Sequence, residues 1–288
     1  MNILTFWQRY HSAERSFSDV QLPKADFCHA NLSGLDFTHS DLSASSFIWA
    51  DVSGAVLVDA NLQDTIAIWL QGLWTDLTEA DVRRADWSCA NLTAANLAQS
   101  NFAKAKLSGA TLCEISAQDA NFSNAQFLGV WAKGADFSSA CLYKTDWATA
   151  QLTEAQLAVA DISWSNLSQV IGIKANFTSA NLAGCNLSFA DFTDACFREA
   201  DLTITNCQNA CLKGANLQNA DLRGANLTNA NLAGADLTGA NLQNTNLANA
   251  LCTNVLGIPS GETVAPSLMT GLGRRSATWK SYIKNQAF

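Results

Sequence analysis

Residues 215–222, which read Ala-Asn-Leu-Gln-Asn-Ala-Asp-Leu, contain the five-residue unit that decides the fold. The unit consists of a small residue, Asn or Asp, a large apolar residue and two further residues. The large apolar position recurs at every number ending in 2 or 7 from Leu22 to Leu247, and 40 of these 46 positions hold Leu, Phe, Val, Ile or Trp. Two positions earlier, 40 of 46 residues are Ala, Ser, Thr or Cys. The phase never shifts, so one internal repeat dominates the chain.

A period of five fits neither an α-helix nor a long β-strand. The small and the large position lie two residues apart, so both side chains point to one side of a short extended segment. The three residues that follow must then turn the chain. Four such corners predict a square coil of 20 residues, with Asn or Asp suited to hydrogen-bond locally beside each turn.

Exceptions to the pattern support a shared narrow interior. In four units a small residue at the large position is accompanied by a large residue two positions earlier, as in Leu70 with Gly72 and Val170 with Gly172. A close-packed core penalises lost volume unless a neighbour replaces it. We therefore expect both positions to face one core. The small residues at the large position are Ala67, Gly72, Ala117, Ala132, Gly172 and Cys207.

The repeat over residues 18–257 resembles the pentapeptide-repeat family. The resemblance implies an all-β fold, a right-handed quadrilateral β-helix (a pentapeptide-repeat solenoid) of about twelve 20-residue coils. Residues 10–17, Tyr-His-Ser-Ala-Glu-Arg-Ser-Phe, resemble the short lead-in of cyanobacterial members.

Both ends of a solenoid need caps, because they expose backbone hydrogen-bonding groups. Residues 1–17 are expected to form an N-terminal cap, with a short amphipathic helix within residues 2–16. Residues 258–288 form a C-terminal cap or tail, for which three interpretations stay open: a capping helix, an exposed basic tail or a dimerisation element. In quinolone-resistance relatives a C-terminal segment makes the dimer, which implies a homodimer through this segment. Its basic residues are Arg274, Arg275, Lys280 and Lys284.

Composition excludes several classes of protein. The net charge is −8 and only 15% of residues are charged, which argues against nucleic-acid binding because phosphates need clustered Lys and Arg. No apolar run is long enough for a transmembrane helix, and the N-terminus lacks the features of a secretion signal. The nine cysteines are odd in number and form no Cys-x-x-Cys pair, so neither a disulfide framework nor a zinc site is indicated. We expect reduced thiols and a cytoplasmic location. The cyanobacterial resemblance also raises thylakoid association.

No motif for catalysis or cofactor binding occurs, so we expect no catalytic, cofactor or metal residues and no enzyme. The recurring aspartates belong to the repeat. His29 and His39 are ten residues apart, half a coil, and should face opposite sides instead of sharing a metal.

Large apolar residues occupy turn positions in one region where polar residues are usual. Residues 20 apart should stack on one face, and both Trp49 with Trp69 and Ile48 with Ile68 have this spacing. An exposed apolar cluster containing Trp indicates a protein interface. In the alternative interpretation the corner loosens near Ala67 and Gly72, and some of these side chains turn inward or lie along the coil. This candidate partner surface, the tryptophan patch, is Ile48, Trp49, Ile68, Trp69, Leu73 and Trp74.

The N-terminal third is also acidic. Between Gln21 and Val82 nine acids accompany a single base, Lys24. A basic, partly apolar surface would complement it, whereas the alternative is that the acids only keep a rod soluble. The candidate acidic face consists of Asp51, Asp59, Asp64, Asp76, Glu79 and Asp81.

These features predict a non-enzymatic scaffold, adaptor or regulator that binds an unidentified protein through the faces of a rigid rod. The family resemblance offers an alternative, a DNA mimic that binds a type II topoisomerase (gyrase), as quinolone-resistance members do. The acids gather near one end of the repeat, and no projecting loop interrupts it, which disfavours this alternative.

Overall fold

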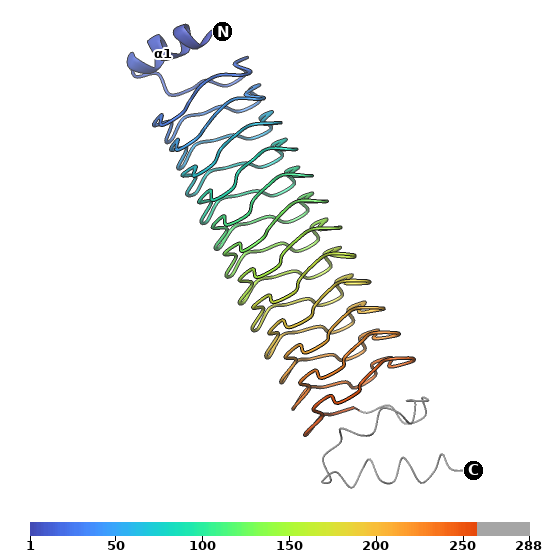
Figure 1. Cartoon of the computed structure of the whole chain (residues 1–288). Coiled ribbons are helices and arrows are strands. Elements are labelled where there is room, and N and C mark those ends of the chain that lie inside the picture. The colour runs from blue at the N-terminus through green and yellow to red at the C-terminus, as the bar shows by residue number, and fades with distance from the viewer. Residues whose placement is uncertain (258–288) are drawn as a thin grey trace, which may run out of the picture.

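The computed structural model describes residues 1–257, which form a helix followed by a rod of stacked coils (Figure 1). The three interpretations of residues 258–288 lie outside the described residues. Within the described part no helix has the length and apolar character needed to cross a membrane.

Parallel bridges join each coil to the next. The middle residue of every unit pairs with the residue 20 positions later, from Ser16 with Asp36 to Asp236 with Leu256. Backbone hydrogen bonds run both ways: Leu22 N–H donates to the Asp41 carbonyl at 2.8 Å, and Asp41 N–H donates to the Val20 carbonyl at 2.9 Å. Within residues 1–257 the extended segments are single bridges, with no longer strand. Each coil therefore has four short sides and four turns.

Every turn has one residue in the left-handed region. The N–H of Ala30 donates to the carbonyl of Phe27 at 3.0 Å, and the second of the two intervening residues, His29, has a φ of 58°. A positive φ at this position is the mark of a type II turn. All corresponding residues from Asp19 to Asn254 share it. Asp or Asn at the middle of the preceding segment accepts a nearby N–H, as Asp36 does from Thr38 at 3.0 Å.

The small and the large residue of each unit fill the interior, as the exceptions in the sequence predict. Ala215 and Leu217 are fully buried, and this pattern holds along the rod. Two tryptophans also occupy the core, and each indole N–H has a partner: Trp87 donates to Thr65 at 3.0 Å and Trp147 to Thr145 at 2.8 Å. No buried side-chain polar atom of the described residues lacks a hydrogen bond.

Glycines at large positions are compensated from the following coil as well as from their own unit. A Cβ at Gly72 would lie 2.9 Å from Cδ2 of Leu92, and a Cβ at Gly172 would lie 2.6 Å from the ring of Phe192. Leu70, two positions before Gly72, is buried as expected. A side chain of the next coil therefore also fills the space that each glycine leaves, which the five-residue pattern alone does not reveal.

Helix α1, Ile3–His11, covers the N-terminal end of the core. Asn2 caps it by accepting the N–H of Thr5 at 2.8 Å. Phe6 is fully buried, and its ring centroid lies 4.5 Å from that of Phe17. The Tyr10 hydroxyl donates to the carbonyl of Asn31 at 2.8 Å, which ties the helix to the first coil.

Candidate protein-binding surface

Residues 20 apart lie on the same side of the rod, because each bridge joins a residue to the one 20 positions later. We call the side centred on Asp51 and Gln71, with its two flanking turns, the tryptophan side. The side centred on Asp41 and Asp81, with its flanking turns, is half a coil away and therefore opposite; we call it the charged side.

The tryptophan patch lies on the two turns that flank the tryptophan side, and its indoles are exposed. Trp49 and Trp69 stack with ring centroids 5.3 Å apart and an interplanar angle of 10°. Their exposed fractions are 52% and 45%, and that of Trp74 is 67%. The coil does not loosen here, since the bridges continue without a break through residues 46–91, and the three indoles do not turn inward.

The aliphatic members of the patch are less exposed than the sequence pattern suggested. Ile48, Ile68 and Leu73 are half-buried beside the tryptophans. They occupy the first of the two central turn residues, whereas the tryptophans occupy the second. The second position projects further from the rod, so the indoles form the accessible part of the patch.

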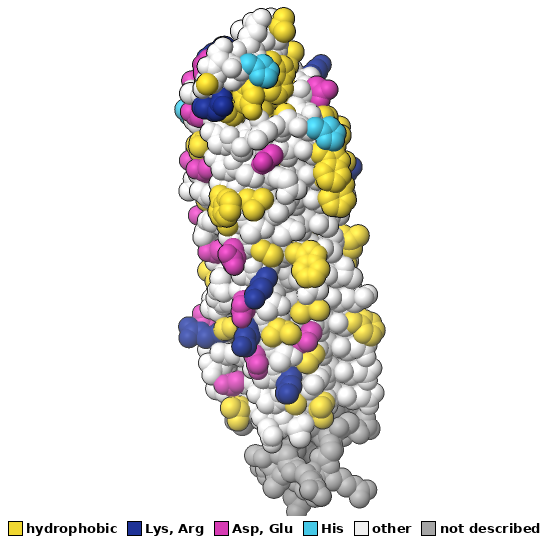
Figure 2. Space-filling view, turned by 90° about the vertical axis from the view of Figure 1, so that its left-hand side faces the viewer, with side chains coloured by type: hydrophobic (Ala, Val, Ile, Leu, Met, Phe, Trp, Pro, Cys, Tyr) yellow, Lys and Arg dark blue, Asp and Glu magenta, His cyan; other side chains and the backbone are white. Residues whose placement is uncertain are grey.

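Further exposed apolar residues continue along the tryptophan side. Trp131 and Ile171 lie at the centre of this side, and both bridge to Gln151 between them. Four of the five exposed tryptophans among residues 1–257 are therefore on the tryptophan side; the fifth, Trp164, lies at a corner of the charged side. Figure 2 shows hydrophobic side chains standing among polar ones, with a stack ending in a histidine along one edge of the view. The surface is a series of aromatic projections and not one continuous patch.

The three patch tryptophans are unfavourable for folding in two ways. Each has a left-handed backbone, with φ of 58° at Trp49, 60° at Trp69 and 54° at Trp74. This conformation disfavours side chains other than Gly, Asn and Asp. Each also leaves a large apolar surface in water. Neither property stabilises the coil.

The six acidic residues do not form one face. Asp51 lies at the centre of the tryptophan side, and Asp76 lies on the next side along the coil, just after Trp74. Asp59 and Glu79 stack at the far corner of that next side, where it meets the charged side. Asp64 and Asp81 belong to the charged side itself. The expected single acidic face is therefore wrong, because five-residue steps place these carboxylates on different walls.

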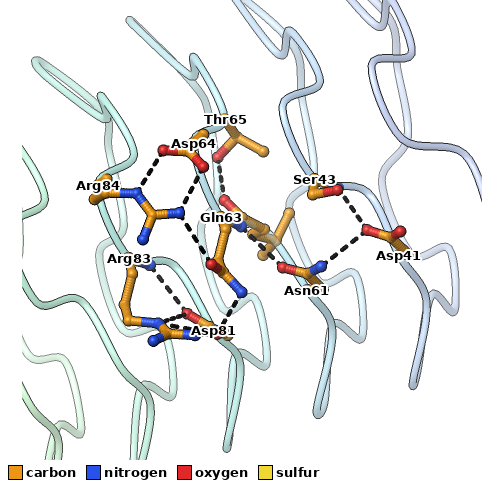
Figure 3. A network of polar contacts seen from close by, with 10 residues as sticks. Asp41, Ser43, Asn61, Gln63, Asp64, Thr65, Asp81, Arg83 and Arg84 are labelled. Atoms are coloured by element: carbon orange, nitrogen blue, oxygen red, sulfur yellow. Dashed lines mark hydrogen bonds and ion pairs between the residues drawn. The ribbon is translucent and has the colours of Figure 1, made fainter.

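Two arginines pair with Asp64 and Asp81 on the charged side (Figure 3). Arg84 comes from the coil that follows Asp64, whereas Arg83 lies two residues after Asp81 in the same coil. Arg84 Nη2 lies 2.6 Å from Asp64 Oδ2, and Arg83 Nη2 lies 2.6 Å from Asp81 Oδ2. The hydrogen bond from Arg84 holds the pKa of Asp64 below its ordinary value. Gln63 also donates to Asp81 at 2.8 Å, which closes the network.

Ion pairs are distributed unevenly around the rod. Among residues 1–257, none lies on the tryptophan side, and none involves Asp51, Asp59, Asp76 or Glu79. In the repeat, all but Lys106 with Asp86 lie on the charged side. Within residues 1–257 the rod thus has one side that carries most of the exposed tryptophans and no ion pair, and an opposite side that holds nearly all the ion pairs of the repeat.

The histidines of residues 1–257 lie far along the rod from the two buried thiols. His29 and His39 occupy opposite corners, and His39 Nδ1 lies 3.7 Å from Asp19. No group of His, Cys, Asp and Glu within residues 1–257 could hold a metal ion. Burial raises the pKa of the Cys185 thiol to about 12 and that of Cys207 to about 11, which keeps both thiols protonated.

The family comparison agrees with this geometry. Eight copies of the family model described as pentapeptide repeats match the chain, at residues 21–57, 75–112, 100–138, 133–169, 173–206, 197–219 and 215–251. The chain belongs to the pentapeptide-repeat family. Its fold is accordingly a β-helix solenoid, and a non-enzymatic binding protein fits this family.

Solved structures of pentapeptide-repeat proteins resemble the chain. HetL, involved in heterocyst differentiation regulation in the cyanobacterium Nostoc sp. strain PCC 7120, is 28% identical, with 88% of this chain and 97% of HetL covered and a TM-score of 0.48. A protein from the Arabidopsis thaliana thylakoid lumen is 31% identical over 36% of this chain and 65% of its own, with a TM-score of 0.22. QnrB1, a plasmid-mediated fluoroquinolone resistance protein, is 18% identical over 64% of this chain and 88% of its own, with a TM-score of 0.28. A search of curated proteins finds no match.

Proposed function

We propose that this pentapeptide-repeat protein is a non-enzymatic scaffold or adaptor of the cytoplasm that binds another protein through its tryptophan side. The exposed indoles of Trp49, Trp69 and Trp74 on adjacent turns carry the proposal. Tryptophan dominates the binding energy of many protein interfaces, because a rigid indole buries a large area at a low entropic cost.

The finer architecture belongs to the same proposal. The bridges from Ser16 to Leu256 and the rod in Figure 1 support about twelve coils of a right-handed quadrilateral β-helix. In such a rod every coil rests on its neighbours, so the tryptophan side is held rigid before a partner arrives. Preorganisation of this kind reduces the entropy lost on binding.

Affinity capture from the native host tests the proposal. The tagged full chain and its Trp49→Ala/Trp69→Ala variant are used as baits, and retained proteins are identified by mass spectrometry. Trp164→Ala serves as the matched control, since Trp164 is an exposed, left-handed turn residue at a corner of the charged side. We expect a partner retained by the wild type and by the control and lost by the double variant. Equal retention by all three baits would exclude the tryptophan side.

The DNA-mimic alternative needs an extended negative surface. The charged side instead interleaves its acids with Arg83, Arg84, Arg198 and Arg223, each in an ion pair. This observation favours the scaffold. A supercoiling assay with purified gyrase separates the two functions: the scaffold predicts no inhibition at micromolar protein, and inhibition would support the DNA mimic.

A further inference from the structure

One corner of the rod carries charges that alternate in sign from coil to coil. This corner is the flanking turn of the tryptophan side that bears Trp74 in an earlier coil. In six successive coils the two central residues of this turn include a single charged residue, acidic and basic by turns. We call these residues the alternating column: Glu114, Lys133, Glu154, Lys174, Asp194 and Lys213.

Backbone hydrogen bonds stack these turns directly on one another. The N–H of Glu114 donates to the carbonyl of Lys133 at 3.0 Å, and the N–H of Asp194 donates to the carbonyl of Lys213 at 2.8 Å. The parallel bridges beside these turns run without a break from Thr111 to Cys211. Neighbouring members of the column therefore lie roughly 4.8 Å apart along the rod.

The charges of the column have no partner in the rod. All six side chains are exposed, and none forms an ion pair with a residue of 1–257. Counted by Lys, Arg, Asp and Glu, no other corner of residues 1–257 alternates in sign over more than two coils. These charges are therefore available to a second molecule whose own charges alternate at the same interval.

The column is complementary to itself when it is reversed, because it has an even number of alternating charges. In a two-fold pair of antiparallel rods, residue i of one copy faces residue j of the other, and j faces i. With the two-fold axis level with the midpoint between Glu154 and Lys174, every member faces an opposite charge. A shift by one coil would place like charges opposite each other, so the charges select one register. The facing pairs, each formed twice, are Glu114 with Lys213, Lys133 with Asp194, and Glu154 with Lys174.

We propose that two copies of this chain pack antiparallel along this corner and the adjoining tryptophan side, in the register that the alternating column sets. Trp131 and Ile171 lie at the centre of that side, in the coils of Lys133 and Lys174, and both are exposed. An antiparallel copy covers them, so apolar burial supplies affinity. The ion pairs are individually weak at a surface and fix orientation and register instead.

The arrangement leaves the tryptophan patch outside the paired column. Trp74 lies two coils before Glu114, and Trp49 and Trp69 lie in the same coil as Trp74 or earlier. Because the two rods run in opposite directions, the two patches of the pair lie toward its opposite ends. The pair therefore presents two separate sites for the protein partner, which a single chain does not.

A zero-length carbodiimide cross-linker tests the pairing in the full chain, because it joins a carboxylate only to an amine that touches it. Glu114 and Lys213 lie five coils apart in one chain, roughly 24 Å, so a link between them forms only between copies. In a mixture of isotopically light and heavy chains, we expect mixed dimers linked from Glu114 to Lys213 and from Asp194 to Lys133. Mass spectrometry identifies the linked peptides. Dimers without either link overturn the proposal.

Sedimentation velocity at low salt, over micromolar concentrations, measures the dimer in charge variants. Lys174→Glu places two acids opposite each other at both central pairs, and we expect the dissociation constant to rise about tenfold or more. Glu154→Lys/Lys174→Glu exchanges the two charges without changing the net charge, and we expect affinity within about twofold of the wild type. Thermal unfolding of each variant checks that the rod is intact.

Lys104→Glu is the matched control for Lys174→Glu. Both residues are exposed and left-handed, with φ of 64° at Lys104 and 58° at Lys174, but Lys104 lies at the opposite corner of the rod. The two variants change the net charge equally. We expect Lys104→Glu to alter the dissociation constant less than about twofold.

The other outcomes overturn the proposal. Equal weakening by Lys174→Glu and Lys104→Glu would show that association follows net charge, and no recovery in the exchange variant would show that residues 154 and 174 do not face each other. A dimer that no variant weakens would place the contact elsewhere, and a monomer at every concentration would mean that no contact exists. The scaffold function is tested separately, because its captured partner depends on Trp49 and Trp69 whether or not two columns pair.

Discussion

The N-terminal and C-terminal coils have the same interior and differ at the turns. From Asn209 to Asn254 every left-handed turn residue is Asn or Gly, the residues that adopt this conformation most readily. From His29 to Cys89 only Gly34, Gly54, Asp59 and Asp64 suit that conformation, and the other turns carry His, Trp, Glu, Arg, Ala or Cys. The turn residue points away from the core, so the coil tolerates any side chain there. Departures from Asn and Gly continue through the middle coils as far as Ile204, so only the last coils keep to the preferred residues throughout.

The largest expected effect tests whether the two regions share one kind of core. Leu77 in the N-terminal coils and Leu227 in the C-terminal coils are both fully buried at the same position of the unit. Leu77→Ala and Leu227→Ala should each lower the free energy of unfolding by about 2–5 kcal/mol, because each leaves a cavity. Denaturant titration measures both. A loss of less than about 1 kcal/mol in one region alone would contradict a common interior.

A smaller effect is expected from exchanging turn residues between the regions. Trp74→Asn replaces a strained, exposed indole and should raise the free energy of unfolding by about 1 kcal/mol, whereas Asn229→Trp should lower it by a similar amount. The two backbones match closely, with φ of 54° and 58°. The same denaturant titration measures both variants. If Trp74→Asn destabilises the rod, the indole has a structural role and the argument for an interface at Trp74 is lost.

The smallest effect concerns acid stability, which both regions should share. Asp64 accepts hydrogen bonds from Arg84, and Asp221 accepts them from Arg223, and each bond lowers the pKa of the carboxyl. A carboxyl whose pKa is lower in the folded state stabilises the fold above its unfolded pKa, and this contribution is lost as the pH falls through the folded value. Unfolding temperatures should therefore drop below about pH 4, and less steeply in Asp64→Asn and in Asp221→Asn. Each effect is small because the pairs are exposed. If the unfolding temperatures of both variants fall as steeply with decreasing pH as that of the wild type, these two carboxylates do not contribute to acid stability.

The interior was predictable because two of every five residues point inward, and their small and large apolar side chains recur at fixed positions in the sequence. The burial of Ala215 and Leu217 follows from this repeat. The large residues two positions before Gly72 and Gly172 indicated that both inward positions share one core. The contributions of Leu92 and Phe192 were not predictable, because they come from the next coil and depend on side-chain directions. The sequence left the exposure of Trp49, Trp69 and Trp74 open, because a loosened corner could have turned them inward, and the unbroken bridges with the exposed indoles decide it.

The acidic face could not be predicted from charge counted along the chain. The acidic stretch ends at Val82, and the next two residues are Arg83 and Arg84. Stacking brings Arg84 back to Asp64, which is 20 residues earlier in sequence and one coil away in space. In a solenoid the charges near an acid include those of the residues stacked on it, 20 positions away in the same column, and not only those of its neighbours in the sequence. A count by columns would have separated Asp64 and Asp81 from Asp59 and Glu79.

The 20-residue register of the bridges also limits how the chain can change in length. Deleting one unit of five residues keeps every apolar side chain inside, but it turns everything downstream by a quarter of a revolution. Trp131 and Ile171 would then move off the column of Asp51 and Gln71. Only a gain or loss of whole coils preserves the alignment of surface features from end to end. The core tolerates insertions and deletions of five residues, whereas a surface that spans many coils tolerates only those of twenty residues.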